Sequence, residues 1–207
     1  MINTISRSLA VRLGGKLDVN KDSIDLYAYG LEIVLGTAVQ LSIIAVLAYI
    51  LGIFPTTIVF LLTFCFFRWL GGGVHLSTFV RCSAFSLVLS LSMGSVALME
   101  FSMLWLVVML IMSVFIAVYV CIAWVPAGTE KKMISDKKLR LKQKKEMLLF
   151  LTIWVFVVTL CMGYNSSYVL ASLLGLLWSC FMIMPCGYRF MGVIDNFFKK
   201  EGGEECV

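Results

Sequence analysis

Residues 58–92 read IVFLLTFCFFRWLGGGVHLSTFVRCSAFSLVLSLS. Apolar runs lie on both sides of a polar break that contains three consecutive glycines, the only histidine of the chain, His75, and a cysteine, Cys82. A lipid bilayer does not hydrogen-bond exposed backbone groups, so such a break is costly unless something uses it. The stretch therefore predicts two membrane spans joined by a candidate functional segment, residues 68–82.

The composition of the whole chain is that of a membrane protein. Of its 207 residues, 61% are hydrophobic and 14% are charged, whereas soluble domains average about 45–50% and about 25%. The net charge of +5 comes mainly from the N-terminal segment, one central loop and the C-terminal segment. This pattern is typical of loops at a membrane surface, and without a nucleic-acid-binding motif we expect no nucleic-acid partner.

The hydropathy pattern predicts an all-α polytopic membrane protein with about six transmembrane helices inside residues 26–187. A span needs roughly 20 apolar residues, and the second expected span is short. Residues 1–25 are expected to form an amphipathic interfacial helix, with a plain solvated arm as the alternative, and residues 188–207 a C-terminal tail. The expected spans are 26–53, 55–70, 77–99, 103–125, 147–162 and 168–184.

Charged loops set the expected orientation in the membrane. The loop at residues 127–146 contains eight lysines and arginines, and loops rich in these residues stay in the cytoplasm. Counting spans from this loop places both chain ends and the segment 68–82 on the same side. We therefore expect a multi-pass protein of the plasma membrane, in contact with the lipid bilayer, with these parts cytoplasmic.

A cysteine nucleophile needs at least a nearby base, and a histidine can be that base. On one straight helix the seven residues from His75 to Cys82 would separate them by roughly 10 Å, which is too far for a hydrogen bond. The glycines at 71–73 leave the backbone before His75 free to bend. We expect the imidazole to fold over the start of the next span, which Ser77 or Thr78 caps.

Other interpretations of this segment stay open on the residues alone. A lone histidine can hydrogen-bond a neighbouring helix and glycines can form a close helix contact, or the segment can be a transport or proton-relay site. Arg68 and Arg81 can be interface anchors, or can favour a Cys82 thiolate together with an imidazolium form of His75. One histidine without partners argues against zinc, and we expect neither a metal nor another cofactor.

The segment resembles the accessory gene regulator protein B family, AgrB, whose members are bacterial membrane cysteine endopeptidases that mature quorum-sensing propeptides. The resemblance rests on the order Arg68, Gly73, His75 and Cys82 and on residues 125–132, VPAGTEKK, which lead into the basic loop. Span number and the amphipathic N-terminus extend it over nearly the whole chain. Departures from residues common in the family occur at Trp69, Leu76 and Met133.

The resemblance implies a catalytic pair in which Cys82 is the nucleophile and His75 the general base. The substrate would be an AgrD-like propeptide with an acidic C-terminal tail, which is cleaved through a thioester and cyclised to a thiolactone or lactone. A homodimer is compatible with the family. Candidates for stabilising an oxyanion or shaping the site are Arg68, Gly71, Gly72 and Gly73. Candidates for docking the acidic tail, or for attracting anionic lipid, are Arg81, Lys131, Lys132, Lys137 and Lys138.

A small-solute or peptide transporter without proteolytic activity is the main alternative. Such a protein would need charged residues along a path through the membrane. Only Glu32 and Glu100 are candidates, and both lie near the ends of expected spans. A scaffold or sensor subunit is a further alternative and would need neither His75 nor Cys82.

Overall fold

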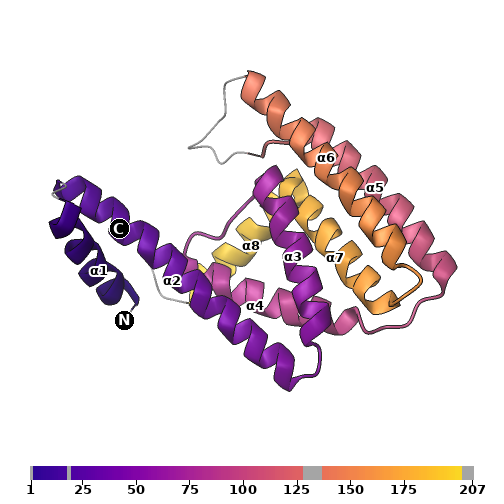
Figure 1. Cartoon of the computed structure of the whole chain (residues 1–207), viewed down its shortest axis with the longest axis horizontal. Coiled ribbons are helices and arrows are strands. Elements are labelled where there is room, and N and C mark those ends of the chain that lie inside the picture. Colours follow the sequence, from indigo (N-terminus) through magenta and orange to yellow (C-terminus); the bar gives the residue numbers. More distant parts are fainter. Residues whose placement is uncertain (1, 18–19, 128–136, 202–207) are drawn as a thin grey trace. The chain divides into compact units, whose positions relative to one another are not determined.

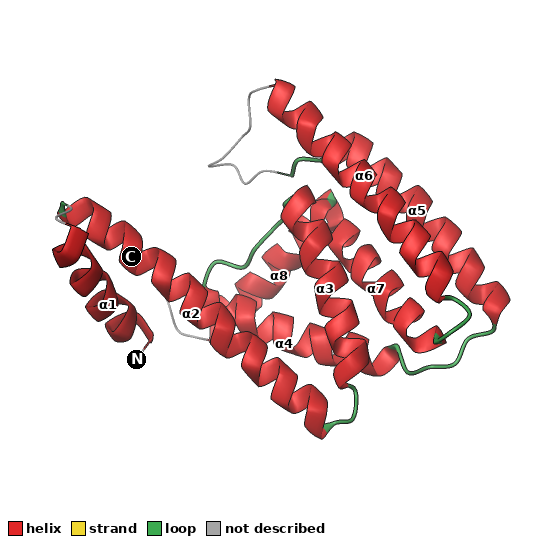
Figure 2. Cartoon of the chain, in the orientation of Figure 1, coloured by secondary structure: helices red, strands yellow, loops and turns green. Residues whose placement is uncertain are grey.

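The computed structural model describes residues 2–17, 20–127 and 137–201, and this part of the chain consists of helices and short connecting segments (Figures 1 and 2). The all-α fold class expected from the sequence is confirmed. The chain divides into two compact units, Met1–Leu47 and Ala48–Val207. The helices are α1 (Ile2–Leu17), α2 (Lys21–Ile50), α3 (Phe54–Gly71), α4 (Phe79–Val96), α5 (Met103–Trp124), α6 (Lys137–Cys161), α7 (Ser166–Ile183) and α8 (Pro185–Glu201).

The first unit contains α1 and most of α2. Asn20 caps α2, because its Oδ1 accepts hydrogen bonds from the Ser23 backbone nitrogen at 3.0 Å and the Ser23 hydroxyl at 2.7 Å. On α1, the apolar side chains of Ile5, Leu9 and Leu13 remain exposed. The interfacial position expected for this helix stays a prediction.

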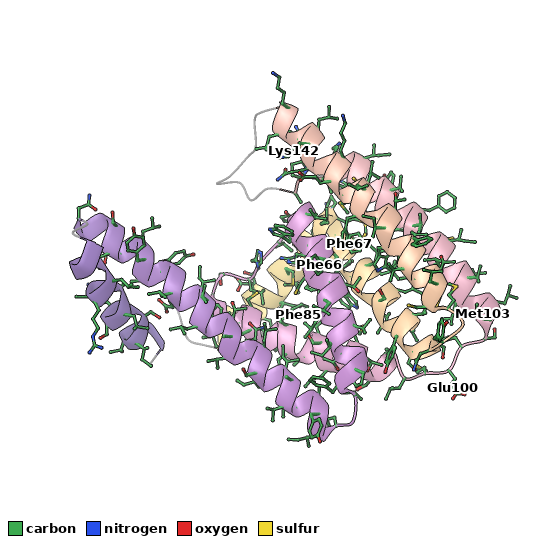
Figure 3. All side chains as sticks on the ribbon, in the orientation of Figure 1. Phe66, Phe67, Phe85, Glu100, Met103 and Lys142 are labelled. Atoms are coloured by element: carbon green, nitrogen blue, oxygen red, sulfur yellow. The ribbon has the colours of Figure 1, made fainter. Side chains whose placement is uncertain are left out.

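Among the described residues, five helices are long and apolar enough to cross a membrane, namely α2 from Ser23 onward, α3, α4, α5 and α7. The remaining expected span corresponds to α6, which begins at Lys137 rather than near Met147. Residues 137–146 were expected to be loop and instead form the first turns of α6, because they are almost all strong helix formers. In Figure 3, Lys142 lies at the opposite end of the α5–α6 pair from Glu100 and Met103.

Helix α7 lies at the centre of the second unit. In its most apolar window 61% of the residues are buried, against 17–39% for the other candidate spans. It packs most extensively on α3 and α5 (Figure 1). The core formed by α3, α5, α6 and α7 includes Phe67, Val120, Trp154 and Leu173.

Small and hydroxyl-bearing residues hold α3, α6 and α7 together. A Cβ added at Gly175 would lie 2.8 Å from the Phe60 carbonyl oxygen, so the glycine allows α7 to approach the α3 backbone. The Ser172 hydroxyl lies 3.0 Å from Thr63 Oγ1 and accepts a 2.8 Å hydrogen bond from Trp154 Nε1. Close approach and interhelical hydrogen bonds are the main means of helix association in lipid, where apolar contact gives no advantage over lipid tails.

The C-terminal residues fold back onto the bundle as α8. Residues 188–201, expected in a C-terminal tail, continue this helix from Pro185 to Glu201. Met191 on α8 is buried against Leu76 and Met182, at the ends of α3 and α7 where the candidate functional segment lies.

The close contact at Gly175 predicts that replacing this glycine with alanine destabilises the protein, although alanine favours helix formation. Alanine normally stabilises a helix by about 1 kcal/mol relative to glycine, but Gly175→Ala is expected to lower the thermal unfolding temperature in detergent micelles, since overpacking costs about 1–3 kcal/mol. Gly192→Ala is the control, because a Cβ there meets open space. An equal or higher unfolding temperature for Gly175→Ala than for Gly192→Ala would contradict the close α3–α7 contact.

Candidate functional site

His75, in the connection between α3 and α4, lies beside Cys82 in the first turn of α4. Cys82 Sγ is 3.9 Å from His75 Nδ1. The side-chain oxygen of Thr78 accepts a bond from the Arg81 backbone nitrogen at 3.4 Å and caps α4, so Cys82 lies at the end of the first turn. The turn before α4 therefore brings together two side chains that a continuous helix would hold about 10 Å apart.

Two glycines produce this turn. Helix α3 ends at Gly71, and the next residues, Gly72 and Gly73, have φ angles of 77° and 126°. These angles lie in the left-handed region, which favours glycine. A Cβ at Gly73 would also lie 2.8 Å from Arg68 Nη1 and 2.9 Å from the Met182 carbonyl oxygen. Both conformation and space therefore require glycine at this point.

Backbone hydrogen bonds fix the turn to two other parts of the chain. Gly73 N donates to the Ala127 oxygen at 3.3 Å, and Ala127 N donates to the Gly71 oxygen at 2.9 Å. Val74 N donates to the Met182 oxygen at 3.3 Å, at the end of α7. The expected motif at residues 125–132 thus begins against the glycine turn, although residues 128–136 lie outside the described part.

The same bonds limit what the glycine amides can do. Gly72 N donates to the Arg68 oxygen at 2.8 Å, and Gly73 N is bonded to Ala127. The expectation that these amides bind an oxyanion does not fit this conformation, because both already donate to carbonyl oxygens. A Cβ at Gly71 would lie 2.4 Å from Ile183 Cδ1. Close neighbours therefore surround all three glycines, whose role in shaping the site stays a prediction.

Arg68 reaches into the site from the last turn of α3. Its Nη2 donates to the Val74 carbonyl oxygen, and its guanidinium interacts electrostatically with Cys82 and with Tyr188 on α8. Nη1 is buried and has no hydrogen-bond partner among the residues that the structure describes. A buried donor of this kind is costly unless a ligand uses it.

The environment of His75 favours the neutral imidazole. Desolvation by the surrounding protein lowers the pKa of His75 below its ordinary value of 6.5, and the positive charge of Arg68 lowers this pKa further. The side chain still keeps an exposed edge. This direction disfavours the imidazolium form that would support a Cys82 thiolate, and it suits a group that accepts a proton from a neighbouring thiol.

Arg81 has partners within the protein. Its Nη1 donates to the Ser77 hydroxyl at 3.2 Å and forms a 3.4 Å ion pair with Asp195 on α8. The sequence interpretation missed Asp195, which is separated from Arg81 by 114 positions. In the sequence, Asp195 is only a carboxylate on an amphipathic C-terminal segment, and nothing near it indicates that it pairs with Arg81.

The lysines expected to dock an acidic tail lie only partly in the described structure. Lys131 and Lys132 are outside it, as is the side chain of Lys137, whereas Lys138 is exposed on α6. Lys144 Nζ donates to the Ile122 oxygen at 2.6 Å and so satisfies a carbonyl near the end of α5. Within residues 2–17, 20–127 and 137–201, no three His, Cys, Asp or Glu side chains form a group that could hold a metal ion.

Comparison with known proteins finds relatives of matching length. A family model described as Accessory gene regulator B matches residues 3–183. AgrB-like protein 2 of Clostridium perfringens (strain 13 / Type A) is 26% identical over 215 residues, which is 97% of this chain and 99% of the relative. An AgrB-like protein of Clostridium perfringens (strain SM101 / Type A) is 22% identical over 212 residues, 97% of this chain and 99% of that relative. No solved structure matches the chain significantly.

The only histidine of the chain allows its pKa to be measured directly. NMR titration of the His75 imidazole in detergent micelles is expected to give a pKa below 6.5. Arg68→Gln is expected to raise that value toward 6.5, because it removes the second cause of the shift. A pKa above 6.5 in the wild type, or no change in Arg68→Gln, would contradict this electrostatic account.

Proposed function

Because the chain belongs to the accessory gene regulator B family, we propose that it is a membrane cysteine endopeptidase that matures a short quorum-sensing propeptide. The observation that carries the proposal is the 3.9 Å approach of Cys82 Sγ to His75 Nδ1, where the chain passes from α3 into α4, two helices able to span a membrane. The transporter alternative has less support. Glu100, one of its two candidate charges, is exposed in the turn between α4 and α5.

In the proposed first step, Nδ1 of His75 takes the proton of the Cys82 thiol. A resting distance of 3.9 Å is long for this transfer, and such contacts commonly tighten when substrate binds. The sulfur then bonds to the scissile carbonyl carbon, and the carbonyl electron pair moves to oxygen. When the carbonyl re-forms, the C–N bond breaks, and the amine leaves with the proton from His75. A thioester on Cys82 remains.

Arg68 is the proposed partner for the negative charge of the tetrahedral intermediate. Its buried Nη1 lacks a hydrogen-bond partner among the described residues, and the guanidinium interacts electrostatically with Cys82. A preorganised donor near the developing charge is the largest single contribution in many acyl-transfer enzymes. This role replaces the one expected for the glycine amides.

The second proposed step closes a ring in the peptide. A cysteine thiol or serine hydroxyl of the bound peptide attacks the thioester carbonyl and loses its proton to His75. The Cys82 sulfur leaves with the bonding pair and takes the proton from His75, and the product is a thiolactone or lactone. A site at the membrane edge that limits water favours this exchange over hydrolysis.

The chain is a multi-pass membrane protein, and we propose the orientation from its charges. Lys138, Arg140, Lys142 and Lys144 are on the described part of the basic segment, and lysine-rich loops stay in the cytoplasm. The glycine turn contacts Ala127, immediately before this segment. The catalytic segment, both chain ends and the substrate-docking lysines then face the cytoplasm of a bacterial cell. A homodimer in the plasma membrane is part of the same proposal.

Replacing the nucleophile tests the proposed function. Reconstituted wild-type protein and a candidate propeptide should accumulate a covalent adduct at Cys82 that hydroxylamine cleaves, as a thioester does. Cys82→Ala should lower cleavage by at least about 1000-fold, because the covalent route is lost. Cys65→Ala is the control, since Cys65 is exposed on α3. Equal cleavage by wild type and Cys82→Ala would reject the peptidase.

The docking role of the basic segment makes a separate prediction. Replacing Lys131, Lys132, Lys137 and Lys138 together with glutamate should raise the KM for an acidic-tailed propeptide by about 10-fold with little change in kcat, because exposed charge pairs contribute about 0.2–1 kcal/mol each. Arg140, Lys142, Lys144 and Lys145 remain to keep the orientation. A propeptide with a neutral tail is the control. An unchanged KM for the acidic tail would remove the docking role.

A further inference from the structure

The carboxylate of Asp195 contacts both ends of the segment that joins His75 to Cys82. Its Oδ1 accepts a 2.7 Å hydrogen bond from the Ser77 hydroxyl and a 3.4 Å bond from Ser77 N. It also lies 3.4 Å from Nη1 of Arg81, which donates to the Ser77 hydroxyl at 3.2 Å. Ser77 follows His75 by two residues, and Arg81 directly precedes Cys82. One carboxylate oxygen therefore holds a neighbour of each proposed catalytic residue.

Within this cluster the Arg81–Asp195 ion pair is sheltered from solvent, whereas Ser77 is exposed. The Arg81 and Asp195 side chains are each 14% exposed, so solvent screens their attraction less than that of an exposed pair. Helix α8 also has apolar contacts in the same region, where Met191 is buried and Ile194 packs in one cluster with Cys82. The apolar face of α8 therefore fixes where the Asp195 carboxylate lies relative to the start of α4.

We propose that Asp195 is a positioning residue for the His75–Cys82 pair, an inference that rests on the proposed peptidase function. Residues 72–78 form no helix of their own, so the orientation of His75 depends on the bonds that hold this connection. A misplacement of about 1 Å between reacting groups can lower the rate by about 100-fold. Through Ser77 and Arg81, Asp195 restricts the motion of the imidazole and the thiol relative to each other.

Asp195 lies outside the residues that the family model matches. That match ends at residue 183, and α8 begins at Pro185. The residues that supply the chemistry and the residue that holds them in place thus come from different parts of the chain. Asp195 and Ser77 are 118 positions apart in the sequence and meet only through the fold.

The test combines cleavage kinetics with a measurement that does not need peptidase activity. In full-length protein in micelles, Asp195→Asn keeps the size and one oxygen acceptor but removes the attraction to Arg81. We expect kcat to fall by about 10-fold with KM within about twofold. Asp195→Glu should recover part of the loss, and Asn196→Ala, an exposed neighbour on α8, should behave as wild type.

The second measurement is the rate of Cys82 alkylation by iodoacetamide, followed by mass spectrometry of the peptide that contains Cys82. Asp195→Asn should change this rate by at least about threefold when His75 is present. In a His75→Gln background, Asp195→Asn should change the alkylation rate by less than about twofold. The effects of two residues that act together are not additive, so Asp195 has little left to position once His75 is removed. Ser77→Ala, which removes the other end of the 2.7 Å bond, should act in the same direction if Asp195→Asn does not fold.

Each outcome has a distinct meaning. If wild-type protein cleaves no propeptide but the alkylation rates depend on Asp195 only when His75 is present, the peptidase function fails and the positioning of the pair stands. If Cys82→Ala abolishes cleavage while Asp195→Asn matches the wild type in both measurements, the positioning role is overturned. Equal effects of Asp195→Asn on alkylation with and without His75 would also overturn it.

Discussion

The glycine turn after α3 is the constraint on which the site depends. Gly72 and Gly73 adopt positive φ angles, and a side chain at Gly73 would strike both Arg68 and the Met182 carbonyl. The backbone thus reverses direction at Gly72 and Gly73, and the Arg68 side chain fills the space beside Gly73. Because of this reversal, the residues that follow lie over the start of α4 instead of continuing α3. Without it, the imidazole and the thiol would stay about two helical turns apart.

The turn is held by bonds to segments that are distant in the sequence. Ala127 bonds to Gly71 and Gly73, and Met182 bonds to Val74. The Met182 carbonyl lies at the end of α7, the most buried of the candidate spans. Packing between the helices depends on small residues such as Gly175 and on hydroxyl bonds such as Thr63 to Ser172. This packing therefore fixes the glycine turn at the end of the bundle.

Hydropathy and residue spacing predicted the apolar helices, a cap on α4 from Ser77 or Thr78 and the proximity of His75 to Cys82, because each depends on local sequence or on the length of a span. The remaining features depend on contacts between distant segments. Hydrogen bonding of the Gly73 amide to Ala127 removed its expected role. Desolvation of His75, a consequence of the folded surroundings, lowers its pKa and so disfavours the imidazolium form that would support a Cys82 thiolate. The fold-back of α8, which brings Asp195 to Ser77, has no signal in the spacing of the sequence.

Under the proposed function, the residues for chemistry and those for substrate selection lie on different segments. The thiol and imidazole are held by α4, the glycine turn and α8, whereas the basic segment starts at Ala127 and continues into α6. Ala127 is bonded to the turn on both its amide and its carbonyl side. A peptide tail bound by the lysines would therefore lie on a segment whose first residue is fixed to the glycine turn. Because this anchor uses only backbone atoms of Ala127, Gly71 and Gly73, it does not depend on the lysine side chains that follow.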